Sequence, residues 1–429
     1  MKTSAKARLA AGVLALAAAL TAGAALIPGE RTPPVAGAPL QLVETPVSAV
    51  SLAGAIQALT TRLRRLPGDH QAWAQLGSAY VQQARLSADP SFYPKAEQAL
   101  ARSAALSPGN FAALTGQAAL AAGRHDFTEA VRLAKLSQAA NPYGQGAQAV
   151  LADAYTQLGR YGEATRAIDR LMELHPGVAS FTRASYDAEL RGDRTAARRM
   201  LEHALADAVS PADIAYCRHY LGELALRSGD LPGATEQYRL ALQAAPDFAP
   251  ALAGTARAAA LDGRLDEAAG RYAAVVGRLP LAQYVIEYGE VLSAAGKDPA
   301  EQWALLRAQR ELMKAAGVGD DLTWAEFEAD HGSAARAVDH AEAEYARNPN
   351  VVAADALAWA LHRDGRDRQA LPYARKATAT GWRNALLHHH RAEIERSLGL
   401  SAESKKSAAR ARDADPAFSP DLPALARFS

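Results

Sequence analysis

The sequence predicts an all-α fold in which short helices pair and stack along the chain as an α-solenoid. The pattern is clearest in residues 221–246, which read LGELALRSGDLPGATEQYRLALQAAP. Apolar and small residues recur there three and four positions apart, Gly229 interrupts them and Pro246 closes the unit, which is typical of two amphipathic helices joined by a tight turn. The same spacing recurs along most of the chain, and its abundant alanine favours helix.

This pattern resembles the tetratricopeptide repeat, a helix–turn–helix unit of about 34 residues with the signature W-x2-L-G-x2-Y…A-x3-F…P. Arg218 and Ala225 depart from it, because they stand at the positions of the first Trp and Tyr. The resemblance implies about ten repeats that form a right-handed superhelix, in which the first helix of each repeat lines a concave groove. The residues that match the signature are Leu221, Gly222, Ala234, Tyr238, Ala241 and Pro246.

Residues 1–26 have the pattern of an export signal. Lys2, Lys6 and Arg8 precede an apolar run that ends in small residues. The run is either cleaved by signal peptidase or, because about 20 apolar residues span a bilayer, retained as a membrane anchor. The protein is therefore expected to be exported: secreted, periplasmic or attached to the outer face of the cytoplasmic membrane. The only cysteine, Cys217, cannot form an intrachain disulfide and is interpreted as a small buried residue.

The rest of the chain divides into a linker and two parts of one repeat array. Residues 27–50 are rich in proline and glycine and are expected to form a flexible linker. An N-terminal array is predicted for residues 51–314, and a C-terminal array with a capping tail for residues 315–429. The segment 85–95, RLSADPSFYPK, is expected to be an insertion loop, and residues 315–321 are expected to be a flexion point.

The sequence contains no catalytic signature. P-loop, G-x-G-x-x-G, H-E-x-x-H and G-x-S-x-G motifs are absent, and the repeats leave no stretch of domain size for an enzyme. We therefore expect no catalytic residues, no cofactor and no metal. A formal net charge of +1 argues against nucleic acid as the main partner, because a polyanion selects for a basic face.

The strongest hint of another function is the run His388–His390, with His362 one repeat earlier. Consecutive helical residues point about 100° apart, so the three cannot converge on one ion without partners from a neighbouring helix, such as His362 or Glu393. The alternative prediction is thus a cell-surface protein that binds a small ligand or a metal through its His-rich C-terminal repeats.

The leading prediction is a non-enzymatic scaffold that binds a protein or peptide partner in the concave groove. An enzyme with an unrecognised site between repeats is the third alternative; a perturbed carboxylate pair or an enclosed pocket would favour it. Trp359 is interpreted either as an anchor for the partner or as packing against the next repeat. The resemblance places these residues in the groove: Tyr186, Glu189, His219, Glu223, Arg227, Arg257, Glu290, Trp359, His362, Arg363, His389, Glu393 and Arg396.

Overall fold

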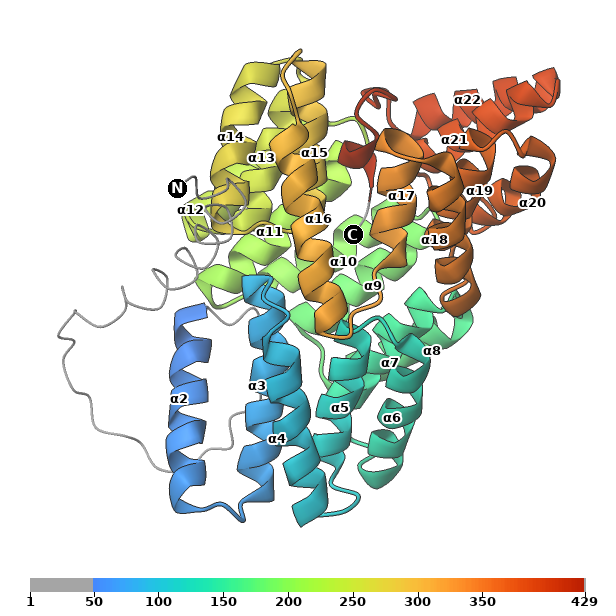
Figure 1. Ribbon diagram of the computed structural model, residues 1–429. Coiled ribbons are helices and arrows are strands. Elements are labelled where there is room, and N and C mark those ends of the chain that lie inside the picture. Colours follow the sequence, from blue (N-terminus) through green and yellow to red (C-terminus); the bar gives the residue numbers. More distant parts are fainter. Residues whose placement is uncertain (1–48, 428–429) are drawn as a thin grey trace, which may run out of the picture. The chain divides into compact units, whose positions relative to one another are not determined.

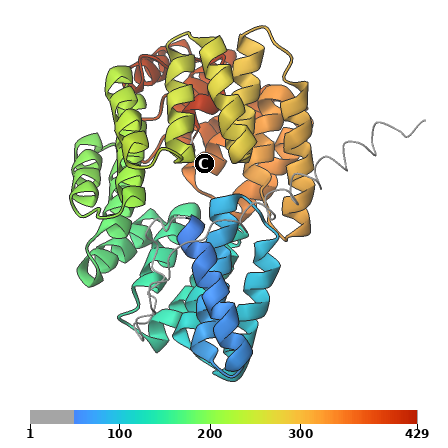
Figure 2. The same cartoon turned by 90° about the vertical axis from the view of Figure 1, so that its left-hand side faces the viewer.

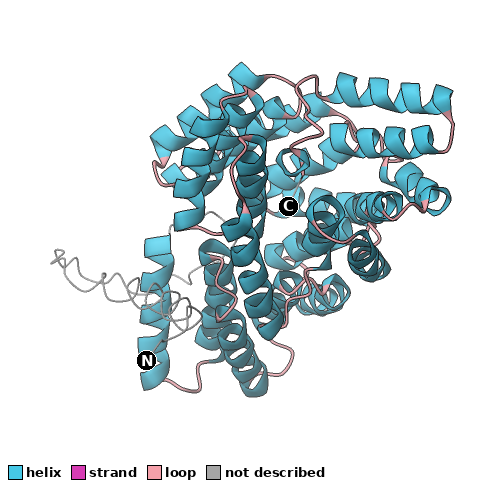
Figure 3. Ribbon diagram, turned by 45° about the horizontal axis from the view of Figure 1, so that its top comes forward, coloured by secondary structure: helices cyan, strands magenta, loops and turns pink. Residues whose placement is uncertain are grey.

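The computed structural model describes residues 49–427, and its regular elements in that range are all helices (Figure 3). The predicted export signal and most of the predicted linker lie outside the described residues. Only residues 49 and 50 of that linker are described, and they are helical. Within the described part of the chain, no helix is long and apolar enough to span a bilayer.

Twenty-one α-helices and one short 3-10 helix, η1, make up the described range. Their bounds are α2 Ala49–Arg65, α3 His70–Ser87, α4 Phe92–Leu106, α5 Phe111–Gly123, α6 Phe127–Ala140, α7 Gln145–Gln157, α8 Tyr161–Leu174, α9 Val178–Leu190, α10 Arg194–Ala206, α11 Pro211–Leu226, α12 Leu231–Ala244, α13 Ala249–Leu261, α14 Leu265–Arg278, α15 Ala282–Ala294, α16 Ala300–Ala315, α17 Asp321–His331, α18 Ala334–Arg347, α19 Val351–Arg363, α20 Asp367–Ala377, α21 Ala385–Ser397, α22 Ser401–Ala414 and η1 Pro423–Ala426.

Successive helices pack side by side as pairs, which the blue, green and yellow parts of Figure 2 show clearly. Ten pairs follow one another from α3/α4 to α21/α22, and α2 precedes them without a first helix of its own. The first helices also contact the first helices of the next repeat, as between α17 and α19. The predicted all-α solenoid of about ten repeats is confirmed. The handedness of its coil stays a prediction.

Glycines let the helices approach closely inside a repeat. The ring of Tyr238 is fully buried between Gly222 on α11 and Gly254 on α13. A Cβ atom at Gly222 would lie 2.6 Å from that ring, and one at Gly254 only 2.5 Å. The small residues of the repeat pattern therefore make room for the large aromatic residue of the second helix.

A left-handed glycine ends the first helix of most repeats, and an aspartate often begins the second. Gly192 has φ +80° and Gly229 has φ +75°, a region in which other residues are strained. The side chain of Asp193 accepts a hydrogen bond from the amide of Ala196 at 2.8 Å, which caps α10. These two devices fix the tight turn that the sequence predicts at each Gly.

The prediction of an insertion loop at residues 85–95 is wrong. Helix α3 continues to Ser87 and α4 already begins at Phe92, so only four residues link them. The additional residues lengthen both helices, and Tyr93 is buried in the core with Val81 and Leu120. Because these apolar side chains find a core, the segment folds as helix.

Turns that are far apart in sequence meet in three dimensions. The Asn350 side chain, before α19, donates a hydrogen bond to the Gln157 carbonyl at 2.7 Å. The Tyr161 hydroxyl accepts one from the Val351 amide at 2.9 Å. The third repeat thus contacts the loop between the eighth and ninth.

The next repeats contact one another with the same offset. Arg194 donates a hydrogen bond to the Arg383 carbonyl at 2.8 Å, and a Cβ at Gly192 would lie 2.4 Å from the Gly381 oxygen. A Cβ at Gly229 would lie 2.5 Å from the ring of Pro416. Repeats three, four and five therefore each meet the end of a repeat five positions later. We call these three contacts the turn-to-turn seam.

Residues 315–321, the predicted flexion point, make a further contact between segments that are far apart in sequence. Val318 is buried in the same core as Tyr93 and Leu120, and the Gly319 amide approaches the Arg124 carbonyl at 3.4 Å. The second repeat therefore holds this segment by packing and by a backbone contact. A division of the array at residue 315 stays a prediction.

Candidate functional site: the inner face of the first helices

Charged side chains from four successive first helices form a continuous series of ion pairs. We call this series the ion ladder; it consists of Glu189 on α9, Glu223 and Arg227 on α11, Arg257 on α13 and Glu287 on α15. Arg227 contacts Glu189 at 2.8 Å and Glu223 at 3.4 Å. Arg257 contacts Glu223 at 2.6 Å and Glu287 at 2.8 Å. Each first helix is thereby linked to the next.

The ladder is buried and its remaining polar atoms bind tyrosines. The Tyr238 hydroxyl donates to Glu223 at 2.6 Å and the Tyr272 hydroxyl donates to Glu287 at 2.9 Å. Burial opposes ionisation of Glu223, but the positive charges of Arg257, His219 and Arg227 outweigh it and lower its pKa to about 2. Burial raises the pKa of Glu287 despite its contact with Arg257.

A second group of acidic residues lies further along the same face and holds a single arginine. We call it the Arg427 pocket; it is formed by Glu290 on α15, Glu326 and Asp330 on α17, and Trp359 on α19. The Arg427 side chain is only 8% exposed, donates a hydrogen bond to Asp330 and pairs with Glu326 at 3.3 Å. Burial alone would lower the pKa of Arg427, but the negative charges of Glu326 and Asp330 outweigh it, so the pKa is raised above its usual value.

The segment that carries Arg427 runs along the first helices α15, α17 and α21. We call the side of the first helices that carries the ion ladder and this segment the inner face. We call residues 415–427 the C-terminal tail; in Figure 1 its dark-red end lies between α15 and α17. The Ala424 amide donates to Glu290 at 2.9 Å. Leu422 and Leu425 are buried in a core formed by α13, α14 and α15. Phe418 packs against His389 with ring centroids 5.4 Å apart.

Trp359 is the link between the Arg427 pocket and the histidine run. Its indole donates to Asp330 at 2.8 Å, and its ring stacks on His390 at 4.0 Å with an interplanar angle of 10°. His390 in turn pairs with Asp355 at 2.8 Å. Trp359 is thus half-buried and already engaged on both sides.

The histidines do not converge on a common point. His388 is buried, which lowers its pKa to about 4, whereas His390 pairs with Asp355 and His362 pairs with Asp367 at 2.5 Å. Among the described residues, a different group has metal-ligand spacing: Glu290, Asp330 and His331, with ligand atoms within 4.8 Å of one another. The guanidinium of Arg427 already supplies a positive charge beside that group.

The remaining predicted groove residues are dispersed. Tyr186 packs edge-on against Trp382 near the turn-to-turn seam, and His219 is buried beside Tyr238. Arg363 is exposed, with its guanidinium 5.8 Å from the Trp359 ring. Glu393 and Arg396 form a local pair at 2.7 Å, where Arg396 is exposed.

Sequence reasoning missed five residues of this site. It named Glu290 but not its neighbours, because the repeat pattern gives positions on one helix at a time and no distances between helices. Arg427 lies in the tail, outside any repeat, so no periodicity points to it. A recognisable signal is the acidic spacing of Glu326 and Asp330, which places both on one helical face. The missed residues are Glu287, Glu326, Asp330, His331 and Arg427.

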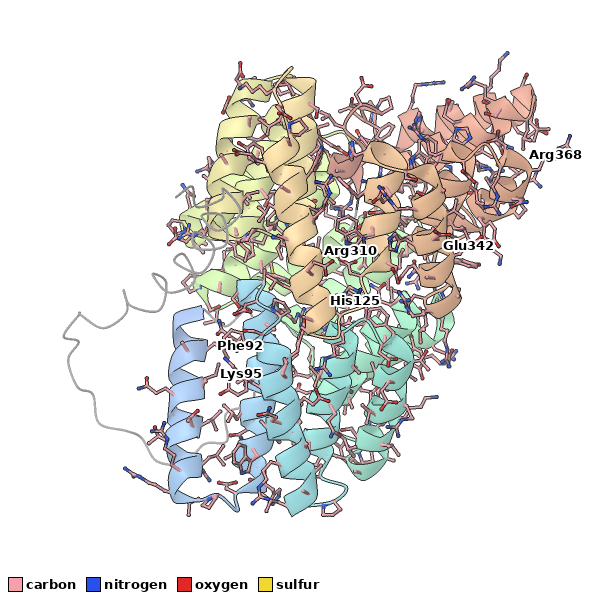
Figure 4. The ribbon with its side chains drawn as sticks, viewed as in Figure 1. Phe92, Lys95, His125, Arg310, Glu342 and Arg368 are labelled. Atoms are coloured by element: carbon pink, nitrogen blue, oxygen red, sulfur yellow. The ribbon has the colours of Figure 1, made fainter. Side chains whose placement is uncertain are left out.

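A separate cavity of about 390 Å³ lies where the end of α3 faces α16 and α17. Figure 4 labels Arg310 on α16 beside it, with Phe92 and Lys95 on α4 and His125 near the end of α16. Arg310 stacks on Trp324 at 4.4 Å and contacts His340 at 2.9 Å. None of the buried acids Glu223, Glu287, Glu290 and Glu326 lines this cavity, so it does not combine with them into an enclosed acid site.

Ten helix pairs with glycine turns and close small-to-large packing define the chain as a tetratricopeptide-repeat-type protein. No model of a protein family matches it, and no curated protein matches it.

Solved structures of repeat proteins resemble parts of the chain. A thermophilic tetratricopeptide protein of Thermus thermophilus is 25% identical over 42% of this chain and 94% of its own, with a TM-score of 0.38. PilW, described as a widely conserved type IV pilus biogenesis factor, is 20% identical over 47% and 96%, with a TM-score of 0.39. PilF of Pseudomonas aeruginosa is 16% identical over 52% and 97%, with a TM-score of 0.38.

Proposed function

We propose that this protein is an exported, non-enzymatic scaffold that binds a segment of a partner protein on the inner face of its first helices. Stacked repeats of this kind generally serve as surfaces for protein interaction. One observation carries the proposal: a peptide segment, the C-terminal tail, already lies on that face and is bound there by backbone, apolar and ionic contacts. A surface that binds one peptide segment has the chemistry to bind another.

The proposal of export rests on the sequence of residues 1–26, whose basic start and apolar run are typical of a signal. The near-zero net charge supports a protein partner over nucleic acid. The expected site is the half-exposed part of the face near Trp359, His362, Arg363 and His389, which the tail borders through Phe418.

We assign no catalytic role to the carboxylates with shifted pKa values. Glu223 and Glu287 pair with Arg257, and Glu290 binds His331 and the tail amide. Burial and these partners account for the direction of each shift. Structural ion networks perturb pKa values as active sites do, so the shifts alone do not favour an enzyme.

The test is capture of the partner from the native envelope fraction, with chemical cross-linking, using the full chain as bait. The variant Trp359→Ala/Arg363→Ala removes an aromatic residue and an arginine from the inner face. Its matched control is Tyr143→Ala/Arg170→Ala, which removes an aromatic residue from an exposed position and an arginine from a half-exposed one.

A protein captured by the native chain and by the control, but lost with the inner-face variant, supports the proposal. Cross-linked peptides from α19 or α21 would place the contact directly. Equal capture by all three baits would overturn the inner-face site. Thermal melting of both variants shows whether a loss of capture reflects unfolding.

A further inference from the structure

The C-terminal tail contacts the last repeat where Phe418 packs on His389 of α21, but it extends well beyond that repeat. Terminal caps of solenoids cover the helix next to them. Here α22 ends at Ala414, and the chain crosses back to α15 and α17, so that Ala424 meets Glu290 and Arg427 meets Asp330. These helices belong to the seventh and eighth repeats, well before the end of the array.

The tail is bound as a peptide ligand would be, in a conformation of turns and one short 3-10 helix. Pro420 and Pro423 disfavour a regular helix, and only the four residues of η1 are helical. Its contacts are one backbone amide donated to Glu290, two leucines in an apolar core, and one guanidinium between carboxylates. This combination of main-chain, apolar and charged anchors is typical of groove-bound peptides.

The pocket is more acidic than the tail is basic. Glu326 and Asp330 pair with a single guanidinium, and the third carboxylate, Glu290, binds His331 at 2.9 Å. Burial raises the pKa of Glu326 to about 7, which indicates that its charge is not fully compensated. Asp330, by contrast, has a lowered pKa because the charge of Arg427 outweighs burial, and a buried ionised carboxylate left without its cation is costly. A segment that replaces the tail is therefore favoured when it brings a positive charge.

The geometry of the pocket also favours arginine over lysine. Asp330 and Glu326 lie on the same face of α17 and contact different nitrogens of the guanidinium, Nη2 and Nε. A planar group with several donors serves both carboxylates at once, which a single ammonium does not. The two leucines precede the arginine by five and two positions.

We propose that the tail is an internal ligand, and that the partner protein binds the same site with a segment of Leu-x-x-Leu-x-Arg chemistry that displaces it. This inference rests on the proposed function, because it names the partner segment and its regulation. The tethered tail competes at a high effective concentration, so a free segment binds the resting protein weakly.

The test uses the full chain and a fluorescent peptide with the sequence of residues 415–429, followed by fluorescence anisotropy. In the chain, Arg427→Ala weakens the tail and opens the pocket. We expect this variant to bind the peptide at least about tenfold more tightly than the native chain does. A peptide with alanine in place of its arginine should bind neither protein.

Arg412→Ala is the matched control, because Arg412 is an exposed arginine on α22 close to the tail in sequence. It should leave the peptide affinity at the native value. If the tail is instead a permanent strap, Arg427→Ala lowers the melting temperature and does not raise the peptide affinity. That result overturns the inference.

Hydrogen exchange of the native chain keeps the test valid even if Arg427→Ala does not fold. Excess peptide should accelerate exchange of the tail amides, Ala424 above all, because it takes over Glu290 and Asp330. The alanine-substituted peptide should not. Unchanged exchange of the tail at saturating peptide overturns the inference.

The outcomes separate this inference from the proposed function. If the envelope fraction yields a partner that depends on the inner face while the tail amides stay protected, the scaffold stands and displacement fails. If the peptide binds the opened pocket but no partner depends on the inner face, the pocket is a peptide site and the proposed function fails.

Discussion

At the scale of single residues, the inner face is dominated by buried charges that depend on one another. Arg257 is 4% exposed and lies between Glu223 and Glu287. Moving two charges out of water costs free energy, and their mutual attraction offsets that cost only when the geometry of the pair is close to ideal. Removing one partner leaves the other charge buried and unpaired. The ladder therefore makes the relative position of neighbouring first helices specific.

Arg257→Met should lower the free energy of unfolding by about 3–5 kcal/mol, because it leaves the buried Glu287 without its cation and removes one of the two cations that pair with Glu223. Chemical denaturation measures this change. Arg239→Met is the control: Arg239 pairs with Glu236 on the surface, where such pairs contribute about 0–1 kcal/mol. Equal effects of the two changes would contradict the structural importance of the ladder.

Glu326 should make stability fall with rising pH. Burial raises its pKa to about 7 from the usual 4.5, so between these values the folded protein holds a proton that the unfolded chain has lost. The stability that comes from this bound proton is fully present below pH 4.5 and is lost as the pH rises to about 7.

Glu326→Gln should remove this dependence, so that the melting temperature of the native chain falls between pH 5 and pH 8 relative to the variant. Over this pH range the free energy of unfolding of the native chain should fall by about 2–3 kcal/mol relative to that of the variant. Glu403→Gln, at an exposed position of α22, is the control and should follow the native profile. Parallel profiles for the Glu326 variant would refute the assignment.

At the scale of elements, the packing of several repeats depends on the fit between a glycine on a first helix and a large side chain on a second helix. Gly254→Ala should destabilise the protein by about 1–3 kcal/mol, because its Cβ would lie 2.5 Å from the buried Tyr238 ring. Gly270→Ala, inside exposed α14 with nothing within 4 Å, should instead stabilise by up to about 1 kcal/mol. Differential scanning calorimetry of both variants compares the signs.

The sequence predicted these elements well because a repeat is specified locally. Leu221, Gly222 and Tyr238 lie within one unit, and their spacing reports the packing of that unit. The loop predicted for residues 85–95 failed because Tyr93 has a core to enter that only the folded array provides. The prediction rested on a segment longer than the usual turn between the two helix patterns, and tertiary packing decided against it.

The same limit applies to the candidate site. Glu223, Arg227 and Arg257 follow from the repeat position alone, since that position puts them on the inner face. Their pairing, and the presence of Arg427 beside Asp330, depend on how the array curves. A periodic pattern carries no information about curvature, because every repeat shows the same local signature.

At the scale of the whole described array, the turn-to-turn seam joins repeats that are far apart in sequence. Gly192→Ala and Gly263→Ala should both strain the backbone, because both residues have φ near +80°. Only Gly192 also faces another turn, with the Gly381 oxygen 2.4 Å from the added Cβ, whereas Gly263 has nothing within 4 Å.

The Gly192 variant should therefore lose about 1–3 kcal/mol more than the Gly263 variant. Urea denaturation of the two proteins under identical conditions gives the difference. Equal losses would show that the seam contributes nothing to stability in solution.

The seam also changes how the array responds to load. A solenoid whose units touch only their neighbours behaves as a soft spring, since small rotations add up along its length. Here the third, fourth and fifth repeats contact the ends of the eighth, ninth and tenth repeats. Successive coils of the solenoid are therefore in direct contact. Tension on the two ends must first break these contacts, after which the coils can separate. The molecule should therefore be stiff at low force and compliant only beyond a threshold.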